Sequence, residues 1–467
     1  MLTATVRWDG SSKFEPDQRW GCFPSVAVAW RASQEKFLQN VKWLSNLKVR
    51  LSYGVTGNNT GVGNYATRTT VAGPVYYPFG STYVNAFYPS SIVDRFLTWE
   101  ESKEINFGID FGFLKNRIFG SVDLYQKTSD DLLYSVELPL EAGTDSDGNP
   151  MKLNTNVGSV QNRGIEFAVT AIPVITKDWR WDISLNYARN INKVKEINGS
   201  GANLPNDNLF IGCSINNVYG YHWAGIVTDR DMIVPNTEIA VAKGLTPGST
   251  MKEYDYYNIC YGLQEGNPII EDVNGDGTID DKDKKVYRSD PSWTGSLTTS
   301  LSYKNWDLSA SLYTKQNYKV YSDFYAQYLD YKDRGWMHLN VDYYIPAGTL
   351  IDCDGINPDG TYINPVYQQT THYGAYPFPN DGNTAGLNGT HAFNRDGSQC
   401  QAITDASFVK VKNITLGYTF PKKWINKIGI SHLRLYCTSN QSRSYGPTTK
   451  DLIRNGPEAV QKTMVLA

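Results

Sequence analysis

Strict alternation of apolar and polar residues over short segments is the feature that most restricts how this chain can fold. Between residues 105 and 113, every odd position is apolar and every even position is small or polar. The apolar residues are Ile105, Phe107, Ile109, Phe111 and Phe113. Because successive side chains of a β-strand point to opposite faces of a sheet, this period of two predicts a strand with one apolar and one polar face.

The same pattern recurs along the chain, often as two alternating segments separated by a tight turn. Lys115-Asn116 and Lys304-Asn305 are two such turns. Short polar turns between alternating segments are typical of antiparallel hairpins, so we predict an all-β, antiparallel fold of about eleven strands. The strands are expected near residues 2–8, 23–31, 47–53, 101–113, 118–127, 163–172, 179–190, 293–303, 306–316, 407–420 and 432–438.

The connections between these strands alternate in length. Those on one side of the predicted sheet are mostly a few residues long, whereas those on the other side span residues 54–100, 128–162, 191–292 and 317–406. Outer-membrane barrels combine short periplasmic turns with long extracellular loops, and their strands have an apolar lipid face and a polar lumen face. The pattern therefore favours a transmembrane β-barrel. A soluble β-sandwich, in which the alternation separates core from solvent, stays open as the alternative.

Aromatic residues lie beside several of the short turns. Trp179, Trp181 and Trp306 follow such turns, and Tyr303 precedes one. Because membrane barrels carry girdles of aromatic residues at both interfaces, we expect these side chains to lie at the periplasmic interface.

Charge and short motifs argue against several classes of function. The chain has 44 Lys+Arg against 47 Asp+Glu, a formal net charge of -3, which gives no general attraction for nucleic acid. No run of about 18 apolar residues indicates a membrane-spanning helix. The histidines lack the spacing of metal or catalytic motifs, and no G-x-S-x-G segment is present, so the sequence predicts no catalytic residues.

The segment from Asp272 to Asp283 has the spacing of a calcium-binding loop. Such loops place oxygen ligands at positions 1, 3, 5, 7, 9 and 12, with glycine at position 6. Here Gly277 occupies position 6, and Asp283 stands where glutamate is usual at position 12. The predicted ligands of a structural Ca²⁺ are the side chains of Asp272, Asn274, Asp276, Asp280 and Asp283 and the carbonyl of Thr278. The alternative is an acidic turn that binds no ion.

Two further features of the long connections allow more than one interpretation. The acidic segments 145–148 and 352–355 lack the later calcium ligands, and we expect them to be ordinary turns. Aromatic residues in the loops could stack on a sugar or pack within the loops themselves. They are Tyr83, Phe87, Tyr88, Tyr325, Tyr328, Tyr331 and Trp336.

Several segments, taken together and in this order, resemble one family. They are Arg19 to Ser25, Leu51 to Asn58, Leu97 to Glu100, Asn106 to Asp110, Asp123 to Tyr125, Asn156 to Glu166 and Asp272 to Asp283. In combination they resemble the barrel of SusC-like (RagA-type) TonB-dependent outer-membrane transporters. The resemblance extends from Leu2 to about Thr438.

What the resemblance implies for the fold is the C-terminal half of such a barrel. The barrels of this class have about 22 strands around a plugged lumen, so residues 1–438 would supply about eleven of them. The tail, residues 439–467, is not alternating, and we expect it to lack the closing strand. The family's signal peptide, plug domain and TonB-contacting segment have no counterpart in the sequence.

The resemblance also implies a function, namely uptake of a nutrient such as a glycan or a peptide across the outer membrane. Its expected partners are a SusD-like lipoprotein at the extracellular mouth and TonB, the latter only through a plug domain. The alternative is a secreted or surface β-sandwich binding protein with a calcium-braced loop. A charge placed at Ile109 or Ile183 separates the two, because these side chains would face lipid in one fold and a protein core in the other.

Overall fold

A single large antiparallel sheet dominates the computed structural model, which describes residues 1–89, 91–144, 148–322, 341–377, 394–395, 398–399, 402–445 and 461–466. The sheet has twelve strands in the order β1-β2-β3-β6-β7-β8-β9-β16-β17-β26-β27-β28, with β1 and β28 at its two edges. The strands are β1 (Leu2–Gly10), β2 (Trp20–Trp30), β3 (Leu44–Asn58), β6 (Glu100–Phe113), β7 (Ile118–Glu137), β8 (Lys152–Ile175), β9 (Trp179–Glu196), β16 (Trp293–Tyr303), β17 (Trp306–Gln316), β26 (Phe408–Thr419), β27 (Arg434–Tyr445) and β28 (Gln461–Leu466).

All eleven predicted strands are present, and the prediction of an antiparallel all-β fold is confirmed. The tail differs from the expectation. β27 continues to Tyr445, and β28 pairs with it from Leu435↔Leu466 to Asn440↔Gln461. The sequence did not predict this twelfth strand, because an edge strand forms by pairing with its neighbour and needs no alternation of its own.

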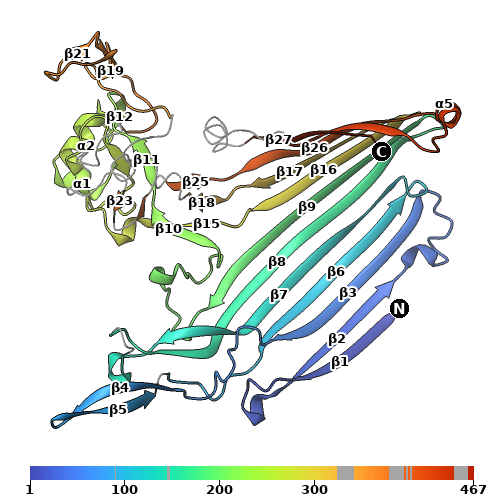
Figure 1. The fold of residues 1–467 in the computed structure, drawn as a ribbon, viewed down its shortest axis with the longest axis horizontal. Coiled ribbons are helices and arrows are strands. Elements are labelled where there is room, and N and C mark those ends of the chain that lie inside the picture. Colours follow the sequence, from blue (N-terminus) through green and yellow to red (C-terminus); the bar gives the residue numbers. More distant parts are fainter. Residues whose placement is uncertain are drawn as a thin grey trace.

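The two ends of the sheet carry connections of different length (Figure 1). At one end, β6 and β7 are joined through residues 114–117, β8 and β9 through 176–178, and β16 and β17 through 304–305. The helix α5 (Lys422–Ile425) lies at this end, between β26 and β27. The long connections all emerge at the opposite end, as the sequence predicts.

The long connections contain small elements of their own. Those before β16 are β4 (Val71–Phe79), β5 (Thr82–Pro89), β10 (Asn217–Tyr221), β11 (Trp223–Ile226), β12 (Asp231–Ile233), α1 (Glu238–Ala242), β13 (Thr250–Lys252), α2 (Glu253–Tyr261), β14 (Pro268–Ile270) and β15 (Lys284–Arg288). Those after β17 are β18 (Lys319–Tyr321), β19 (Leu350–Asp352), β20 (Gly355–Ile356), β21 (Tyr362–Ile363), β22 (Val366–Tyr367), β23 (Asn394–Arg395), β24 (Ser398–Gln399) and β25 (Ile403–Asp405). Within the described residues, none of the helices has the length and apolar character needed to cross a bilayer.

Buried apolar residues gather among the long connections rather than beneath the sheet. One cluster joins Phe14, Phe23, Val62, Leu97 and Trp99, and others lie around α1, α2 and β14. By contrast, the apolar face of the sheet is open to its surroundings. Its exposed residues include Val28, Leu51, Ile105, Phe107, Leu124, Leu185, Leu308 and Leu416.

This open apolar face contradicts the β-sandwich alternative. A sandwich buries the inner face of each sheet against a second sheet, but the other sheets among the described residues are two-stranded ribbons. At the short-turn end the same face carries a band of aromatic rings: Trp179 lies 4.1 Å from Tyr303 and Trp306 lies 4.7 Å from Tyr418 between ring centroids. An apolar outer band edged by such rings is the surface that a bilayer covers.

Candidate functional site

The inner face of the sheet is polar, and strand register aligns its side chains in rows. In one row, Arg50 of β3 stands opposite Gly108 of β6, Gly108 stands opposite Asp123 of β7, and Asp123 stands opposite Glu166 of β8. The next row runs through Lys48, Asp110, Ser121, Ala168, Asn186, Ser296 and Tyr313. Because alternate residues face opposite sides, these rows line the side that the apolar residues do not.

Arg50 is the centre of an ion-pair network on this inner face. One terminal nitrogen of its guanidinium group, Nη2, lies 2.9 Å from Asp110 and 3.0 Å from Asp123. Lys48 adds a weaker contact with Asp110 at 3.7 Å. Gly108 makes the arrangement possible, because a Cβ at this position would lie 2.6 Å from Cζ of Arg50. The ion pairs thus link β3, β6 and β7, and they pass through the space that a side chain at position 108 would fill.

A second arrangement of the same kind lies near the other edge of the sheet. Arg434 of β27 donates to Asp307 of β17 across Gly417 of the intervening strand β26, with a closest separation of 2.5 Å. A Cβ on Gly417 would lie 2.7 Å from both partners. The inner wall therefore uses cross-strand arginine–aspartate pairs at two separate places.

We expect Arg50→Gln to destabilise the folded sheet by about 1 kcal/mol at low ionic strength, because Asp110 and Asp123 would be left as neighbouring like charges. The effect is modest because roughly a third of the Arg50 side chain is exposed, at 32%, and it should shrink in high salt. Urea titration of the folded protein in detergent measures it. The triple variant Arg50→Gln/Asp110→Asn/Asp123→Asn should recover most of the loss; a triple variant as unstable as the single one would contradict the network.

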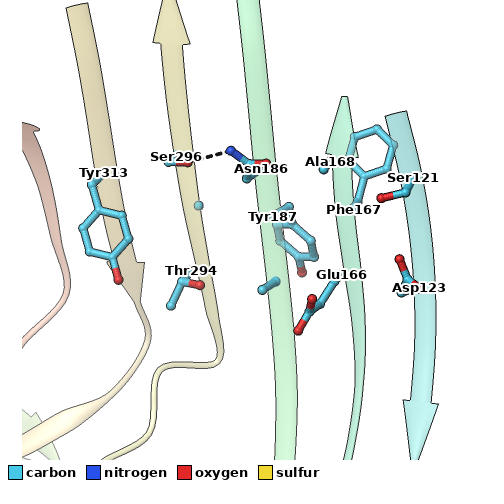
Figure 2. Close-up of a pocket in the computed structure, with 12 residues that line it drawn as sticks. Ser121, Asp123, Glu166, Phe167, Ala168, Asn186, Tyr187, Thr294, Ser296 and Tyr313 are labelled. Atoms are coloured by element: carbon cyan, nitrogen blue, oxygen red, sulfur yellow. Dashed lines mark hydrogen bonds between the residues drawn. The ribbon is translucent and has the colours of Figure 1, made fainter. Parts of the chain in front are cut away.

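A groove of about 200 Å³ lies along the sheet between β7 and β17 (Figure 2). Figure 2 shows hydroxyl, amide, carboxylate and phenol groups brought together from neighbouring strands, which are β7, β8, β9, β16 and β17. Asn186 donates to Ser296 at 3.1 Å, while Glu166 contributes an exposed carboxylate. The residues that line it are Ser121, Asp123, Glu166, Phe167, Ala168, Asn186, Tyr187, Ala188, Thr294, Gly295, Ser296 and Tyr313, of which Phe167 and Tyr187 belong by register to the outer face. Such a surface can hydrogen-bond a polar solute along its whole width.

The predicted calcium loop lies in the long connection between β9 and β16, between β14 and β15. Its first half is a series of backbone turns, each closed by a side-chain oxygen. Asp272 accepts from the N–H groups of Gly275 and Gly277 at 2.6 and 2.7 Å. Asn274 accepts from the N–H of Asp276, and Asp276 accepts from that of Thr278 at 2.8 Å. These residues therefore curl the chain into successive turns.

The second half of the loop is fixed by burial. Asp283 is 0% exposed and accepts from the N–H groups of Val273 and Asp280, both at 2.8 Å. Ile279 is 2% exposed and packs against Tyr221, which anchors the loop. Gly277 has a φ of +85°, and a Cβ there would lie 2.6 Å from the side chain of Ile239. The sharp turn at this position therefore admits only glycine without rearrangement.

The contacts of the loop bear on whether its oxygens can hold an ion. In the part of the chain that the structure describes, no group of three His, Cys, Asp or Glu side chains is placed to hold a metal. The calcium spacing, however, also uses an amide and a carbonyl oxygen, from Asn274 and Thr278. A carboxylate oxygen that accepts one N–H still has a further acceptor site: Oδ1 of Asp272 accepts only the N–H of Gly275 among the described residues, whereas its Oδ2 accepts from both Gly277 and Tyr261.

A neighbouring tyrosine responds to the charge of the loop. Tyr261 donates its hydroxyl hydrogen to Asp272 at 3.0 Å. Burial first, and the nearby Asp272 carboxylate second, raise the pKa of the Tyr261 hydroxyl. The phenol therefore stays protonated and remains a donor to Asp272 at any pH near neutrality.

The structure describes some, but not all, of the loop aromatic residues and acidic segments named from the sequence. Tyr83, Phe87 and Tyr88 lie on β5 and are exposed, so they do not form a core for their own loop. Tyr325, Tyr328, Tyr331, Trp336 and the acidic residues 145–147 lie outside the described residues. In the segment 352–355, Asp352 accepts from the N–H of Cys353 at 2.9 Å.

Sequence reasoning missed the arginine–aspartate pairs of the inner face. Alternation places Arg50, Asp110 and Asp123 on one face, but only the register between strands brings them together. Gly108 and Gly417, each on the polar face of an alternating strand, were the available signal, because glycine inside a strand often marks a close approach.

Comparisons with known proteins agree with this geometry. The family described as "TonB dependent receptor-like, beta-barrel" matches residues 1–438. The chain is similar to the TonB-dependent receptor SusC of Bacteroides thetaiotaomicron, with 33% identity over 91% of this chain and 36% of that protein. Among solved structures it is similar in fold to one titled "Structure of the RagAB peptide transporter", with a TM-score of 0.63, 21% identity, and coverage of 96% of this chain and 42% of the other. The chain thus spans well under half the length of these relatives.

Proposed function

The chain belongs to the TonB-dependent receptor-like β-barrel family, whose members are receptors and transporters of the bacterial outer membrane, and on this basis we propose that it forms part of the wall of a channel for nutrient uptake. The proposed cargo is a glycan or a peptide too large for simple diffusion. The proposal gives the chain no catalytic step: its side chains line the path and bind the cargo in passing.

One observation carries this proposal, namely the polar inner face opposite an apolar outer face. Ser, Thr, Asn, Asp and Glu side chains continue from strand to strand across β7, β8, β9, β16 and β17. Such a wall is wetted by water and offers hydrogen bonds to sugars and to peptide groups alike. The long connections at one end, including the aromatic β4–β5 hairpin, would meet the cargo first.

Two protein partners follow from the same proposal. A SusD-like lipoprotein would bind the long connections at the extracellular mouth, where exposed Tyr83 and Phe87 offer apolar contacts. TonB would supply energy through a plug domain inside the barrel. The inner-face ion pairs around Arg50 lie on the wall that such a plug would contact.

An uptake assay tests the proposal. Cells of the source bacterium with the coding gene deleted are compared with complemented cells for uptake of labelled oligosaccharides and labelled oligopeptides. Complemented cells should accumulate at least one class, and collapse of the proton gradient should abolish the difference. Equal uptake of both classes with and without the gene would overturn the proposal, and the class that depends on the gene identifies the cargo.

We also propose that Asp272, Asn274, Asp276, Thr278, Asp280 and Asp283 bind one structural Ca²⁺ that braces this connection. The oxygen donors and the glycine turn at Gly277 support it. Calcium should then slow proteolysis between β14 and β15, and Asp276→Ala should remove that protection while Asp281→Ala, outside the ligand set, should keep it. Proteolysis unaffected by calcium or by a chelator in the unmodified protein would contradict the site.

A further inference from the structure

The outer face of β3, β6, β7, β8 and β9 carries a groove of about 610 Å³ towards its long-connection end. Its apolar lining is formed by Leu51, Ile105, Phe107, Leu124, Ile165 and Ile191. Two arginines, Arg163 on β8 and Arg189 on β9, line the same groove. A volume of this size is within the range of ligand-binding clefts.

Strand register places both arginines on the lipid-facing side. Leu124 pairs with Ile165, which pairs with Arg189. In the adjacent row, Arg163 pairs with Ile191. Because paired residues of neighbouring strands share a face, the two guanidinium groups stand among the apolar side chains of the outer surface, not in the lumen.

These two arginines differ from those on the inner face. Arg50, Arg180 and Arg434 each pair with an aspartate at 2.9 Å or less. Arg163 and Arg189 are exposed, and within the described residues no carboxylate lies at ion-pair distance from either. The outer face therefore presents two positive charges that the described part of the chain leaves without an ion-pair partner.

Their depth in the membrane follows from the strand length. Trp179 marks the periplasmic interface, where it packs against Tyr303. From residue 179 to residue 189 the strand rises about 33 Å, or about 25 Å in height at a tilt near 40°. The apolar band of an outer-membrane barrel is about 25 Å tall. Arg189 therefore stands at the level of the outer-leaflet headgroups, with Arg163 slightly beyond it.

We propose that Arg163 and Arg189 bind the phosphate group of an anionic lipid of the outer leaflet, whose acyl chains lie against the apolar side chains that line the same groove. The planar guanidinium forks match phosphate oxygens and are weakly hydrated, which suits an interface. The groove continues from the arginines onto Ile165, Phe107 and Leu124, so one amphipathic molecule would satisfy both parts. The proposal depends on the membrane position of the sheet and not on which nutrient is transported.

Lipid titration tests the proposal. The protein, extracted in mild detergent, is titrated with phosphatidylglycerol in mixed micelles, and bound lipid is counted by native mass spectrometry. Arg163→Gln/Arg189→Gln should weaken binding about 25-fold, equivalent to ~2 kcal/mol at ~1 kcal/mol for each basic residue at a membrane surface. Arg163→Lys/Arg189→Lys should lie between, because the charge stays while the fork is lost.

Matched controls separate a lipid site from general attraction. Lys422→Gln/Lys423→Gln removes two charges at α5, at the opposite end of the sheet, and should leave binding unchanged. Each variant is first checked for folding by its heat-dependent gel mobility. Three results would overturn the proposal: equal binding by the Arg163→Gln/Arg189→Gln protein, equal binding of phosphatidylcholine, or displacement of the lipid by millimolar inorganic phosphate.

Discussion

Ile183→Arg is expected to destabilise the barrel by roughly 2–4 kcal/mol and to reduce sharply the amount of folded protein in the outer membrane. Ile183 lies on β9 and pairs with Ala171 and Thr299 on the outer face. It is four residues beyond Trp179, about 13 Å along the strand, which places it near the middle of the apolar band. An arginine there has no lipid headgroup within reach. The measurement is a urea titration in lipid vesicles, together with membrane fractionation.

Ser184→Arg is the matched control, because Ser184 is the next residue on the same strand and faces the lumen. It loses only the hydroxyl contact with Thr170 at 2.9 Å, and the new charge meets water and the polar inner wall. We expect a loss below about 1 kcal/mol. If both arginines were equally harmful, the two faces of β9 would not differ in environment, and the assignment of lipid and lumen sides would fail.

Asp283→Ala is expected to open the segment between β14 and β15, at a cost of about 2–4 kcal/mol. The fully buried carboxylate accepts from the N–H groups of Val273 and Asp280, and its loss leaves two partly buried donors without this acceptor, at about 1–2 kcal/mol each. Hydrogen exchange of these two amides should rise by orders of magnitude, while amides of β9 and β16 keep their protection.

Asp281→Ala provides the comparison within the same turn. Its side chain is 80% exposed and pairs only with Lys284, so a change within about 0.5 kcal/mol is expected. The difference between the two variants should persist in a chelator, because the hydrogen bonds of Asp283 do not need an ion. Equal protection of the amides in Asp283→Ala and Asp281→Ala would contradict this account of the loop.

The membrane-spanning part of the fold was predictable because lipid on one side and water on the other impose alternation residue by residue. Phe107 and Ile109 therefore indicated a strand before any pairing was known. Beyond the bilayer that constraint ends. β8 begins at Lys152 rather than near residue 163. Its outer part includes Asn154, Asn156 and Gly158. There both faces of the strand meet protein or water, so apolar and polar residues no longer alternate.

Local chemistry also made the acidic loop predictable in outline. Gly277 stands where calcium-binding loops use glycine, and its φ of +85° makes the sharp turn that glycine permits. What spacing could not predict was the set of hydrogen bonds made by Asp272 and Asp283, since these depend on how β14 and β15 approach each other. The short helices α1 and α2 were missed for a similar reason: helices of this length are stabilised by their packing rather than by their own sequence.

The most direct test of the membrane assignment is spin-label accessibility along β9 in lipid bilayers. Labels are placed singly from residue 181 to residue 187, in protein whose native cysteines are replaced by serine. Labels at positions 181, 183, 185 and 187 should be reached by dissolved oxygen, and labels at positions 182, 184 and 186 by a water-soluble nickel complex, with a period of two. Uniform accessibility, or the opposite phase, would contradict a sheet with its apolar face in the membrane.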